Sequence, residues 1–341
     1  MQMTRSTGLA QPAPDVQASR PRTEVSLTRV GVRGIEKVIR VGGHRSGDDG
    51  ADAPGRYFFA ELECFVDLNP RQAGVHMSRF EEVVGEAIDS VVLRETLRAE
   101  ELAAHIASRI REQQQGLRAE VTVAARYPET VRTPASELPT QEIYTLLGTA
   151  VVSERGTRTL TGVEAQGMTA CPCAQEMVSG RARERLAADG FTDDEIERVF
   201  AAVPVATHNQ RGIGTLHIGC PEGCDDAIEA RDLLDIVESS MSSEIYELMK
   251  RSDEVEVVEK AHMHPRFVED CVREMVRKAS ERFAGLGEHA FVSARQENLE
   301  TIHKHNVVAE RHGLLGELSR EITEGEVAAR HVTMREWLES A

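Results

Sequence analysis

The stretch YFFAELECFVDL, residues 57–68, predicts a β-strand around which the first half of the chain is ordered. Its phenylalanine and leucine side chains are interspersed with glutamate and aspartate in an imperfect alternation, which is typical of a strand with a bulge or with two partly buried faces. A loop rich in Asp, Gly and Pro precedes it. The other predicted elements of this half are a strand at 25–41, helices at 78–92 and 95–115, and a strand at 118–126.

The second half shows a similar order of elements. Its predicted elements are a hairpin of strands at 143–152 and 157–163, a strand at 214–219, a long helix from Asp225 to Leu248, a helix with Pro265 in its first turn, and a closing strand at 290–295. Two short helices at 176–188 and 193–202 interrupt this order, and Thr192 begins the second with a capping-box sequence. The two halves predict an α+β fold of two tandem ββααββ-like modules.

The predicted domain boundaries follow from these elements. We expect a disordered N-terminal segment at 1–24 and a first module at 25–135. The second module is expected at 136–312, with its helical insertion at 174–205, and a helical tail at 313–341.

The composition limits the possible functions. The chain has 341 residues and 40 basic against 57 acidic side chains, and its formal charge of −17 argues against general binding to nucleic acid or anionic membranes. All but five of the basic residues are arginines, whose forked side chains suit phosphate and carboxylate. No apolar run approaches the roughly 18 residues of a membrane span. The N-terminus lacks the apolar centre of a signal peptide and six cysteines are few, so we expect a cytoplasmic protein.

Two short motifs carry reactive side chains. Cys171-Pro172-Cys173 places two thiols one residue apart across a stiff proline, which suits them poorly to chelating one ion. Either one thiol faces a site while the other packs, or both are small buried hydrophobes. The run Thr207-His208-Asn209-Gln210-Arg211-Gly212 either lines a pocket, where His can bind a metal and Arg a phosphate, or forms a solvated loop.

The remaining candidates are weaker when each is taken alone. They are Lys250-Arg251-Ser252-Asp253-Glu254 at the end of the long predicted helix, His303-Lys304-His305 after the closing strand, Glu269 in a first helical turn, and His76-Met77-Ser78-Arg79 before a helix. One possible metal-ligand set combines one soft, two borderline and one hard donor: Cys171, His208, Glu254 and His303. Zinc or ferrous iron tolerates this mixture and leaves a position open for water.

Eight strings of the sequence carry a family resemblance: 15–19 (DVQAS), 26–32 (SLTRVGV), 76–79 (HMSR), 169–175 (TACPCAQ), 207–212 (THNQRG), 246–254 (YELMKRSDE), 267–270 (FVED) and 293–305 (SARQENLETIHKH). In this order they resemble the metal-dependent GTP cyclohydrolases of type IB, and most closely the MptA branch of archaeal pterin biosynthesis. The insertion between Cys173 and His208 is also similar to that branch.

The resemblance implies a tunnelling fold (T-fold), in which homo-oligomers, here a dimer or tetramer, form barrels with active sites between subunits. It implies that Cys171 and His208 bind the catalytic metal, with Glu254 and His303 as further ligands or proton-transfer groups. It also implies that Glu269 accepts hydrogen bonds from guanine. Two arginines are expected to hold the triphosphate of GTP, Arg79 and Arg211.

The family reaction opens the imidazole ring of guanine at C8, releases formate and closes a dihydropterin. The MptA branch forms 7,8-dihydroneopterin 2′,3′-cyclic phosphate for tetrahydromethanopterin synthesis and is expected to use Fe(II), with Mn(II) or Zn(II) as the alternative. Other type IB enzymes keep the triphosphate for folate synthesis, and this product is the alternative here. Neither nucleic acid nor a membrane is an expected partner.

Two further readings of the sequence remain open at this point. Another T-fold enzyme, a nitrile reductase of queuosine synthesis, would use NADPH and a covalent cysteine nucleophile. A non-enzymatic reading makes Cys171, Cys173, Cys220 and Cys224 a structural zinc knot. The one-residue spacing at Cys171 suits this knot poorly, and it leaves His208 without a role.

Overall fold

The computed structural model describes residues 15–41, 56–90, 98–220 and 228–340. Its strands are β1 (Leu27–Val41), β2 (Arg56–Leu68), β3 (Arg118–Arg132), β4 (Pro139–Ser153), β5 (Thr157–Ala170), β6 (Asn209–Cys220), β7 (Ser243–Glu244), β8 (Phe291–Asn298) and β9 (Val307–Leu314). Its helices are α1 (Met77–Ser90), α2 (Ala99–Gln114), α3 (Pro172–Ala188), α4 (Asp193–Ala202), α5 (Ala230–Ser239), α6 (Arg251–Met263), α7 (Val268–Arg282), α8 (Leu315–Glu324) and α9 (Met334–Glu339), with a 3₁₀ turn at Ala284–Leu286. None of the helices in these ranges is long and apolar enough to cross a membrane.

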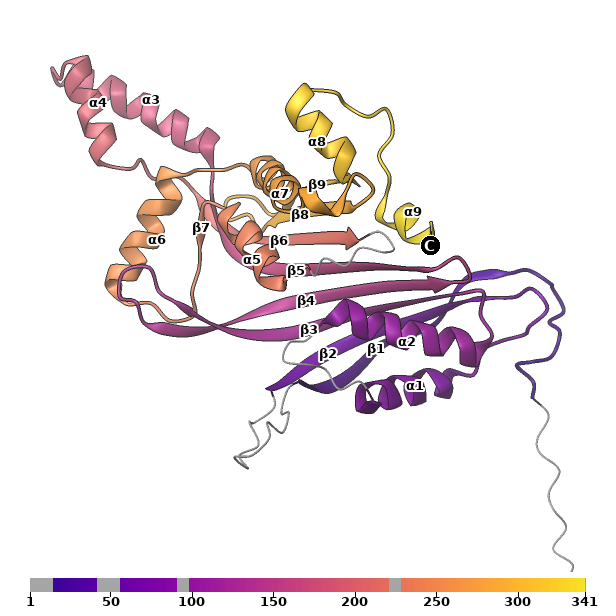
Figure 1. Cartoon of the computed structure of the whole chain (residues 1–341). Helices are drawn as coiled ribbons and strands as arrows, with labels where there is room; N and C mark the ends of the chain where they lie inside the picture. Colours follow the sequence, from indigo (N-terminus) through magenta and orange to yellow (C-terminus); the bar gives the residue numbers. More distant parts are fainter. Residues whose placement is uncertain (1–14, 42–55, 91–97, 221–227, 341) are drawn as a thin grey trace, which may run out of the picture.

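The strands form one antiparallel sheet in the order β1-β2-β3-β4-β5-β6-β8-β9, and the short β7 pairs with β5. Figure 1 shows these strands side by side as a twisted surface that runs through the whole molecule. The predicted α+β class, with strands and helices in separate layers rather than in parallel βαβ units, is therefore confirmed.

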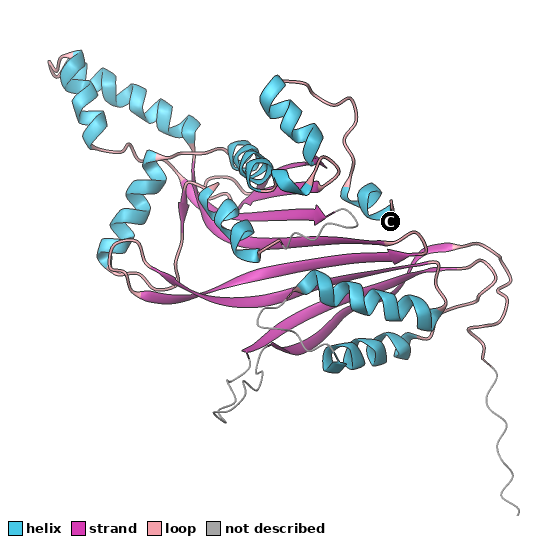
Figure 2. Cartoon of the chain, in the orientation of Figure 1, coloured by secondary structure: helices cyan, strands magenta, loops and turns pink. Residues whose placement is uncertain are grey.

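Helices cover one face of the sheet (Figure 2). The apolar side chains of that face are buried in the core that the helices share with the sheet. In β3, Ala119, Val121 and Val123 are fully buried, whereas the residues between them are half-buried, because successive side chains point to opposite faces. Leu102 and Ile106 of α2 pack into the same core. Burial of each such leucine or isoleucine contributes roughly 1.5–3 kcal/mol, so this core holds the helices on the sheet.

The other face of the sheet is polar along much of its length and is covered at one end by α9. Cross-strand hydroxyls of Thr122 and Thr149 lie 3.3 Å apart on this face. At its covered end, the Trp337 ring stacks on Phe291 with centroids 5.7 Å apart, and its indole N–H donates to the His289 carbonyl at 3.1 Å. The C-terminal helical tail is thus anchored by a small second core.

The predicted insertion forms a helical arm of α3 and α4 that projects from the body of the molecule (Figure 1). None of the residues of α3 is buried, and Ile196 is the buried residue of α4. The predicted capping box is confirmed, because the Thr192 backbone N–H donates to the Glu195 carboxylate at 2.9 Å and the Thr192 hydroxyl accepts from the Glu195 backbone.

The prediction of one long helix from Asp225 to Leu248 is wrong, and Asp225 itself lies outside the described residues. Helix α5 ends at Ser239, and the chain then pairs with β5 as β7, where Ser243 lies opposite Met168. A separate helix, α6, begins at Arg251. Lys250 and Arg251 therefore lie at the N-terminus of a helix, and not at the end of one as the sequence predicts.

Asp253, in the first turn of α6, joins this helix to the turn between β3 and β4. Its buried carboxylate accepts hydrogen bonds from the backbone of Ala135, Ser136 and Lys250 and from the Ser136 hydroxyl, at 2.6–2.9 Å. These hydrogen bonds stabilise the charged form and hold the pKa of Asp253 well below its ordinary value, although burial opposes them. Within the motif at 250–254, Asp253 is therefore the acidic residue that stabilises the fold.

A second carboxyl group, that of Glu238 at the end of α5, has the opposite shift. It is mostly buried and accepts a hydrogen bond of 2.8 Å from the Tyr144 hydroxyl on β4. Burial raises the pKa of Glu238 to about 7, and the Tyr144 hydrogen bond and Arg231 oppose this only in part. The folded protein therefore binds a proton at Glu238 over a pH range in which the unfolded chain has lost it.

We expect the Glu238→Gln variant to be more stable than the parent protein at pH 8 by about 1–3 kcal/mol. The proton-linked stability is complete below about pH 4.5, the ordinary value, and is lost as the pH rises to about 7. Glutamine is always neutral and still accepts from Tyr144. Urea unfolding at pH 5 and pH 8 measures the difference, with Glu82→Gln, at an exposed position of α1, as the control. An equal change in stability at both pH values would contradict the explanation.

Candidate functional site

Cys171 lies where β5 ends and α3 begins. It is the N-cap of α3, its backbone is extended, and Pro172 occupies the first helical position. Its half-buried Sγ accepts a hydrogen bond from the Ala174 backbone at 3.5 Å. The strand thus delivers the thiol to the base of the helical arm.

His208 lies directly beside Cys171 because β5 and β6 are antiparallel neighbours. Ala170 pairs with Asn209, the Cys171 N–H donates to the His208 carbonyl at 3.1 Å, and the Thr207 hydroxyl donates to the Cys171 carbonyl at 3.0 Å. The His208 side chain is only 14 % exposed, and its Nδ1 lies 3.1 Å from Oε1 of Gln210. The structure therefore brings together the backbones of the two predicted metal ligands.

Glu300 joins this site, although none of the sequence motifs described above pointed to it as a site residue. It follows β8, its side chain is 7 % exposed, and its Oε2 lies 3.8 Å from Nδ1 of His208. This buried oxygen has no hydrogen-bond partner. A buried carboxylate oxygen without a hydrogen-bond partner is costly, so its presence here points to a further hydrogen-bond donor in the working site. An acidic residue just after a strand and before the His303 motif was the signal that could have selected it.

The donor chemistry of this site fits a divalent ion such as iron or zinc. Cys171 and His208 are hydrogen-bonded backbone neighbours that carry a thiol and an imidazole, and both are donors that these ions prefer. Within the described ranges, no three His, Cys, Asp or Glu side chains stand close enough together to hold an ion. The described residues of one chain therefore supply only some of the ligands that a bound metal ion would need.

The other two predicted metal ligands lie on exposed segments. Glu254 follows the buried Asp253 on α6 and is exposed. His303 lies in the exposed turn between β8 and β9, where its ring stacks on His305 with centroids 5.3 Å apart. The Thr301 hydroxyl donates to the Asn209 carbonyl at 3.1 Å and thereby ties this turn to the start of β6, the strand that His208 precedes.

Glu269 lies in the first turn of α7, and its side chain is exposed. The segment before this helix docks on the end of β5, since the Arg266 backbone N–H donates to the Ala170 carbonyl at 3.0 Å. The helix α7, which carries Glu269 in its first turn, thus starts beside the strand end that carries Cys171.

The two predicted phosphate ligands are not brought together within one chain. Arg79 lies on α1, where it donates to the Gln113 carbonyl at 3.3 Å, and Figure 1 shows α1 far from the base of the arm. Arg211 is exposed on β6, opposite Met168 of β5. Arg211 therefore belongs to the site near Cys171, whereas Arg79 belongs to the other half of the sheet.

The zinc-knot hypothesis is wrong. Cys220, at the end of β6, is disulfide-bonded, so its sulfur is not a thiolate available to zinc. Cys171 and Cys173 are free thiols at the opposite end of the β5–β6 pair. Cys224 lies outside the described residues.

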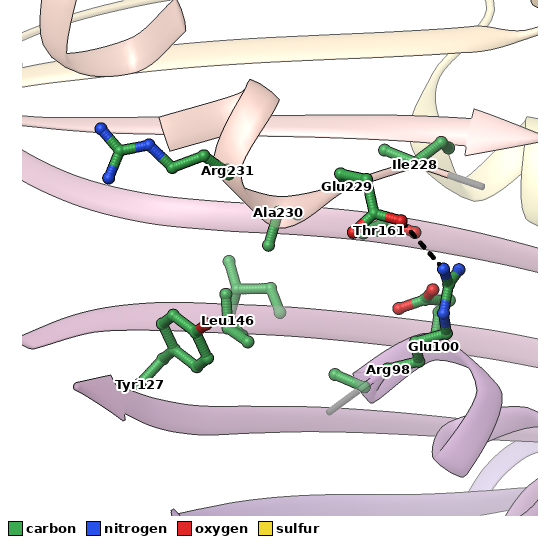
Figure 3. Close-up of a pocket in the computed structure, with 12 residues that line it drawn as sticks. Arg98, Glu100, Tyr127, Leu146, Thr161, Ile228, Glu229, Ala230 and Arg231 are labelled. Atoms are coloured by element: carbon green, nitrogen blue, oxygen red, sulfur yellow. Dashed lines mark hydrogen bonds and ion pairs between the residues drawn. The ribbon is translucent and has the colours of Figure 1, made fainter. Parts of the chain in front are cut away.

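Two cavities lie away from the predicted site residues. One, of about 220 Å³, lies between the N-terminal ends of α2 and α5, where Arg98 forms an ion pair of 3.0 Å with Glu229 (Figure 3). The other, of about 520 Å³, lies between the β3–β4 hairpin and α5 and is lined by Tyr144 and Glu238 among others. Cys171 lines neither of these two cavities.

Comparison with known proteins agrees with the family resemblance. A family model described as type I GTP cyclohydrolase folE2 matches residues 13–309. The GTP cyclohydrolase MptA of Methanococcus aeolicus is 40% identical over 314 residues, which cover 90% of this chain and 99% of that protein. The MptA protein of Methanothermobacter thermautotrophicus is 39% identical, over 91% of this chain and 96% of that protein. The MptA protein of Methanocaldococcus jannaschii is 37% identical, over 90% of this chain and 97% of that protein.

Among solved structures, the uricase from Arthrobacter globiformis aligns with a TM-score of 0.49 and 10% identity, over 90% of this chain and 98% of that one. A uricase from Bacillus fastidious aligns with a TM-score of 0.47 and 8% identity, over 89% and 99%. The sequence matches are much stronger than these structural ones. On the family match over residues 13–309 and on relatives of 37–40% identity, the chain belongs to the type I GTP cyclohydrolase family of folE2 type.

Proposed function

We propose that this chain is a metal-dependent GTP cyclohydrolase that opens guanine at C8, releases formate and closes a dihydropterin. The observation that carries the proposal is that Cys171 and His208 are hydrogen-bonded neighbours at the ends of the adjacent strands β5 and β6, so that a thiol and an imidazole start side by side. The relatives named as GTP cyclohydrolases supply the substrate, GTP. No feature of the described residues favours the nitrile reductase alternative over this reaction.

Cys171 and His208 would hold the metal, with Glu254 and His303 completing the set or moving protons. When bound, a divalent ion supplies a Lewis acid that makes water a better nucleophile near neutral pH. Fe(II) is our first choice, with Mn(II) or Zn(II) as the alternative; imidazole suits iron and zinc, thiolate suits zinc, and carboxylate oxygen suits manganese.

Proton transfer is the task we assign to His303. Breaking the bond between C8 and N9 requires a proton for the departing nitrogen, and an imidazole can give that proton and recover it near neutral pH. The exposed position of His303 in the turn after β8 lets it approach a substrate seated beside His208.

Substrate recognition is assigned to Glu269 and to two arginines. The Glu269 carboxylate would accept hydrogen bonds from the ring N–H and the 2-amino group of guanine. Arg211 and Arg79 would bind the triphosphate, since guanidinium groups pair with phosphate in a bidentate fashion. Because Arg79 lies on the other half of the sheet, it would reach the site from a second copy of the chain.

A homo-oligomer of tandem T-fold modules, a dimer or tetramer, is part of the proposal. β1 and β9 are the outermost strands of the sheet in the described part of the chain. Pairing of β9 with β1 of a second copy would continue the sheet and cover both edges, which otherwise promote aggregation. Helices on one face and polar side chains on the other suit a barrel with helices outside.

The expected product is 7,8-dihydroneopterin 2′,3′-cyclic phosphate, for tetrahydromethanopterin synthesis. The identity to proteins named MptA supports this branch, and 7,8-dihydroneopterin triphosphate for folate synthesis is the alternative.

The test is anaerobic incubation of the protein and GTP with added Fe(II), followed by formate measurement and mass analysis of the pterin. We expect one formate per GTP, together with the cyclic phosphate and pyrophosphate. A triphosphate product would move the chain to the alternative branch. Formate release that persists after complete removal of metal, or GTP left intact, would overturn the proposal.

A further inference from the structure

Gln210, the third residue after Thr207 in the polar run, is buried beside His208 rather than exposed to a substrate. Its side chain is only 5 % exposed. Its Oε1 lies 3.1 Å from Nδ1 of His208, and its Nε2 donates to the Thr169 hydroxyl at 3.1 Å. The amide thus bridges the imidazole to the neighbouring strand.

These contacts determine which nitrogen of His208 carries the proton. An amide oxygen can only accept a hydrogen bond, so with the amide in this orientation Nδ1 is the N–H nitrogen of a neutral ring. The lone pair then lies on Nε2, the nitrogen that remains available to bind an ion. Glu300 does not take over this role, because 3.8 Å from its Oε2 to the same Nδ1 is too long for a hydrogen bond.

The structure orients the Gln210 amide with its oxygen toward His208 and its NH₂ group toward Thr169. Thr169, which accepts from Nε2, is fully buried on β5 and lies directly opposite Gln210 in the strand register. The next residue, Ala170, is held by a hydrogen bond of 3.1 Å from its backbone N–H to the buried Ser242 hydroxyl. Rotation of the amide by 180° would place its NH₂ group against Nδ1 and make that nitrogen the acceptor, so that Nε2 would carry the proton and could not bind an ion.

We propose that Gln210, supported by Thr169, is a positioning residue that fixes the tautomer and ring orientation of His208 so that Nε2 faces the metal. This inference rests on the proposed metal-dependent function. Partners of this kind, one step removed from the metal, change metal affinity by about 10–100-fold when they are lost.

The test measures Co(II) binding to the metal-free full-length protein by titration and by the visible absorption of the bound ion. We expect Gln210→Leu to weaken Co(II) binding about 10–100-fold and to alter the absorption bands. Gln210→Glu keeps an acceptor at the same place and should restore most of the affinity. Thr169→Val removes only the hydroxyl that accepts from the Gln210 amide, so it should weaken Co(II) binding less than Gln210→Leu does. It also provides a second test if the leucine variant does not fold.

The matched control is Gln114→Leu on α2. Gln114 is also almost fully buried and makes two hydrogen bonds, with the backbone of His76, but it is distant from His208. This variant should lose stability and keep the parent Co(II) affinity. Parent affinity and spectrum in both Gln210→Leu and Thr169→Val would overturn the inference while leaving the proposed function intact. Absence of Co(II) binding by the parent protein would overturn both.

Discussion

Replacing Cys171 with serine is expected to reduce GTP turnover by about 10³-fold, together with loss of the bound metal. Serine is a good N-cap, so it can accept the hydrogen bond from the Ala174 backbone that Sγ accepts in the parent protein. Its hydroxyl, however, is not the soft thiolate donor that iron or zinc prefers. The substitution therefore separates the role of Cys171 in starting α3 from its role as a ligand.

The measurement combines metal content, formate release from GTP and thermal unfolding of the metal-free protein. Cys64→Ala is the control, because Cys64 is a free thiol fully buried in β2 and distant from His208. It should change stability slightly and keep metal and turnover. If Cys171→Ser retained metal and turnover, Cys171 would be only a helix cap, and the proposed donor set would have lost its sulfur.

The sequence predicts the elements of this fold better than their ends. The strand predicted at 118–126 continues as β3 to Arg132, since its pairing with β4 extends to the partners Arg132 and Pro139. In this distal part of the hairpin most residues are half-buried or exposed, so apolar alternation fades although the backbone pairing continues. The strand β9 was not predicted for a related reason: it is the outermost strand, and most of its side chains are half-buried or exposed.

The candidate site was predictable only in part from local patterns. The sequence shows that Cys171 and His208 are unusual, but the antiparallel register of β5 and β6 is what places them side by side. Glu300 and Gln210 owe their importance to neighbours that are remote along the chain or on another strand. Hydrogen-bond partners of this kind leave no periodic signal, because each depends on tertiary contacts.

The second large effect is expected at the proposed guanine anchor. Glu269→Gln should lower kcat/KM for GTP by about 10³-fold or more. A binding site that recognises a substrate through hydrogen bonds to a charged group loses much of its rate when one of the substrate's N–H groups is left without an acceptor. A carboxylate accepts hydrogen bonds from both the ring N–H and the 2-amino group of guanine. In glutamine, an NH₂ group replaces one of the two oxygens, so one N–H group of guanine would face another donor. The helix dipole at the start of α7 favours the same negative charge before the substrate binds.

Comparison of GTP with inosine triphosphate, which lacks the 2-amino group, makes this prediction specific for base recognition. The parent protein should strongly prefer GTP, and Glu269→Gln should lose most of that preference while binding metal normally, because Glu269 contributes no metal ligand. Glu281→Gln, near the exposed C-terminal end of the same helix, should keep both the rate and the preference. A Glu269→Gln variant that turned over slowly but kept the parent preference for GTP would show that the carboxylate acts elsewhere than on the guanine edge. The base would then have to be read by another acceptor on the segment that docks against the end of β5, where the Arg266 backbone meets Ala170.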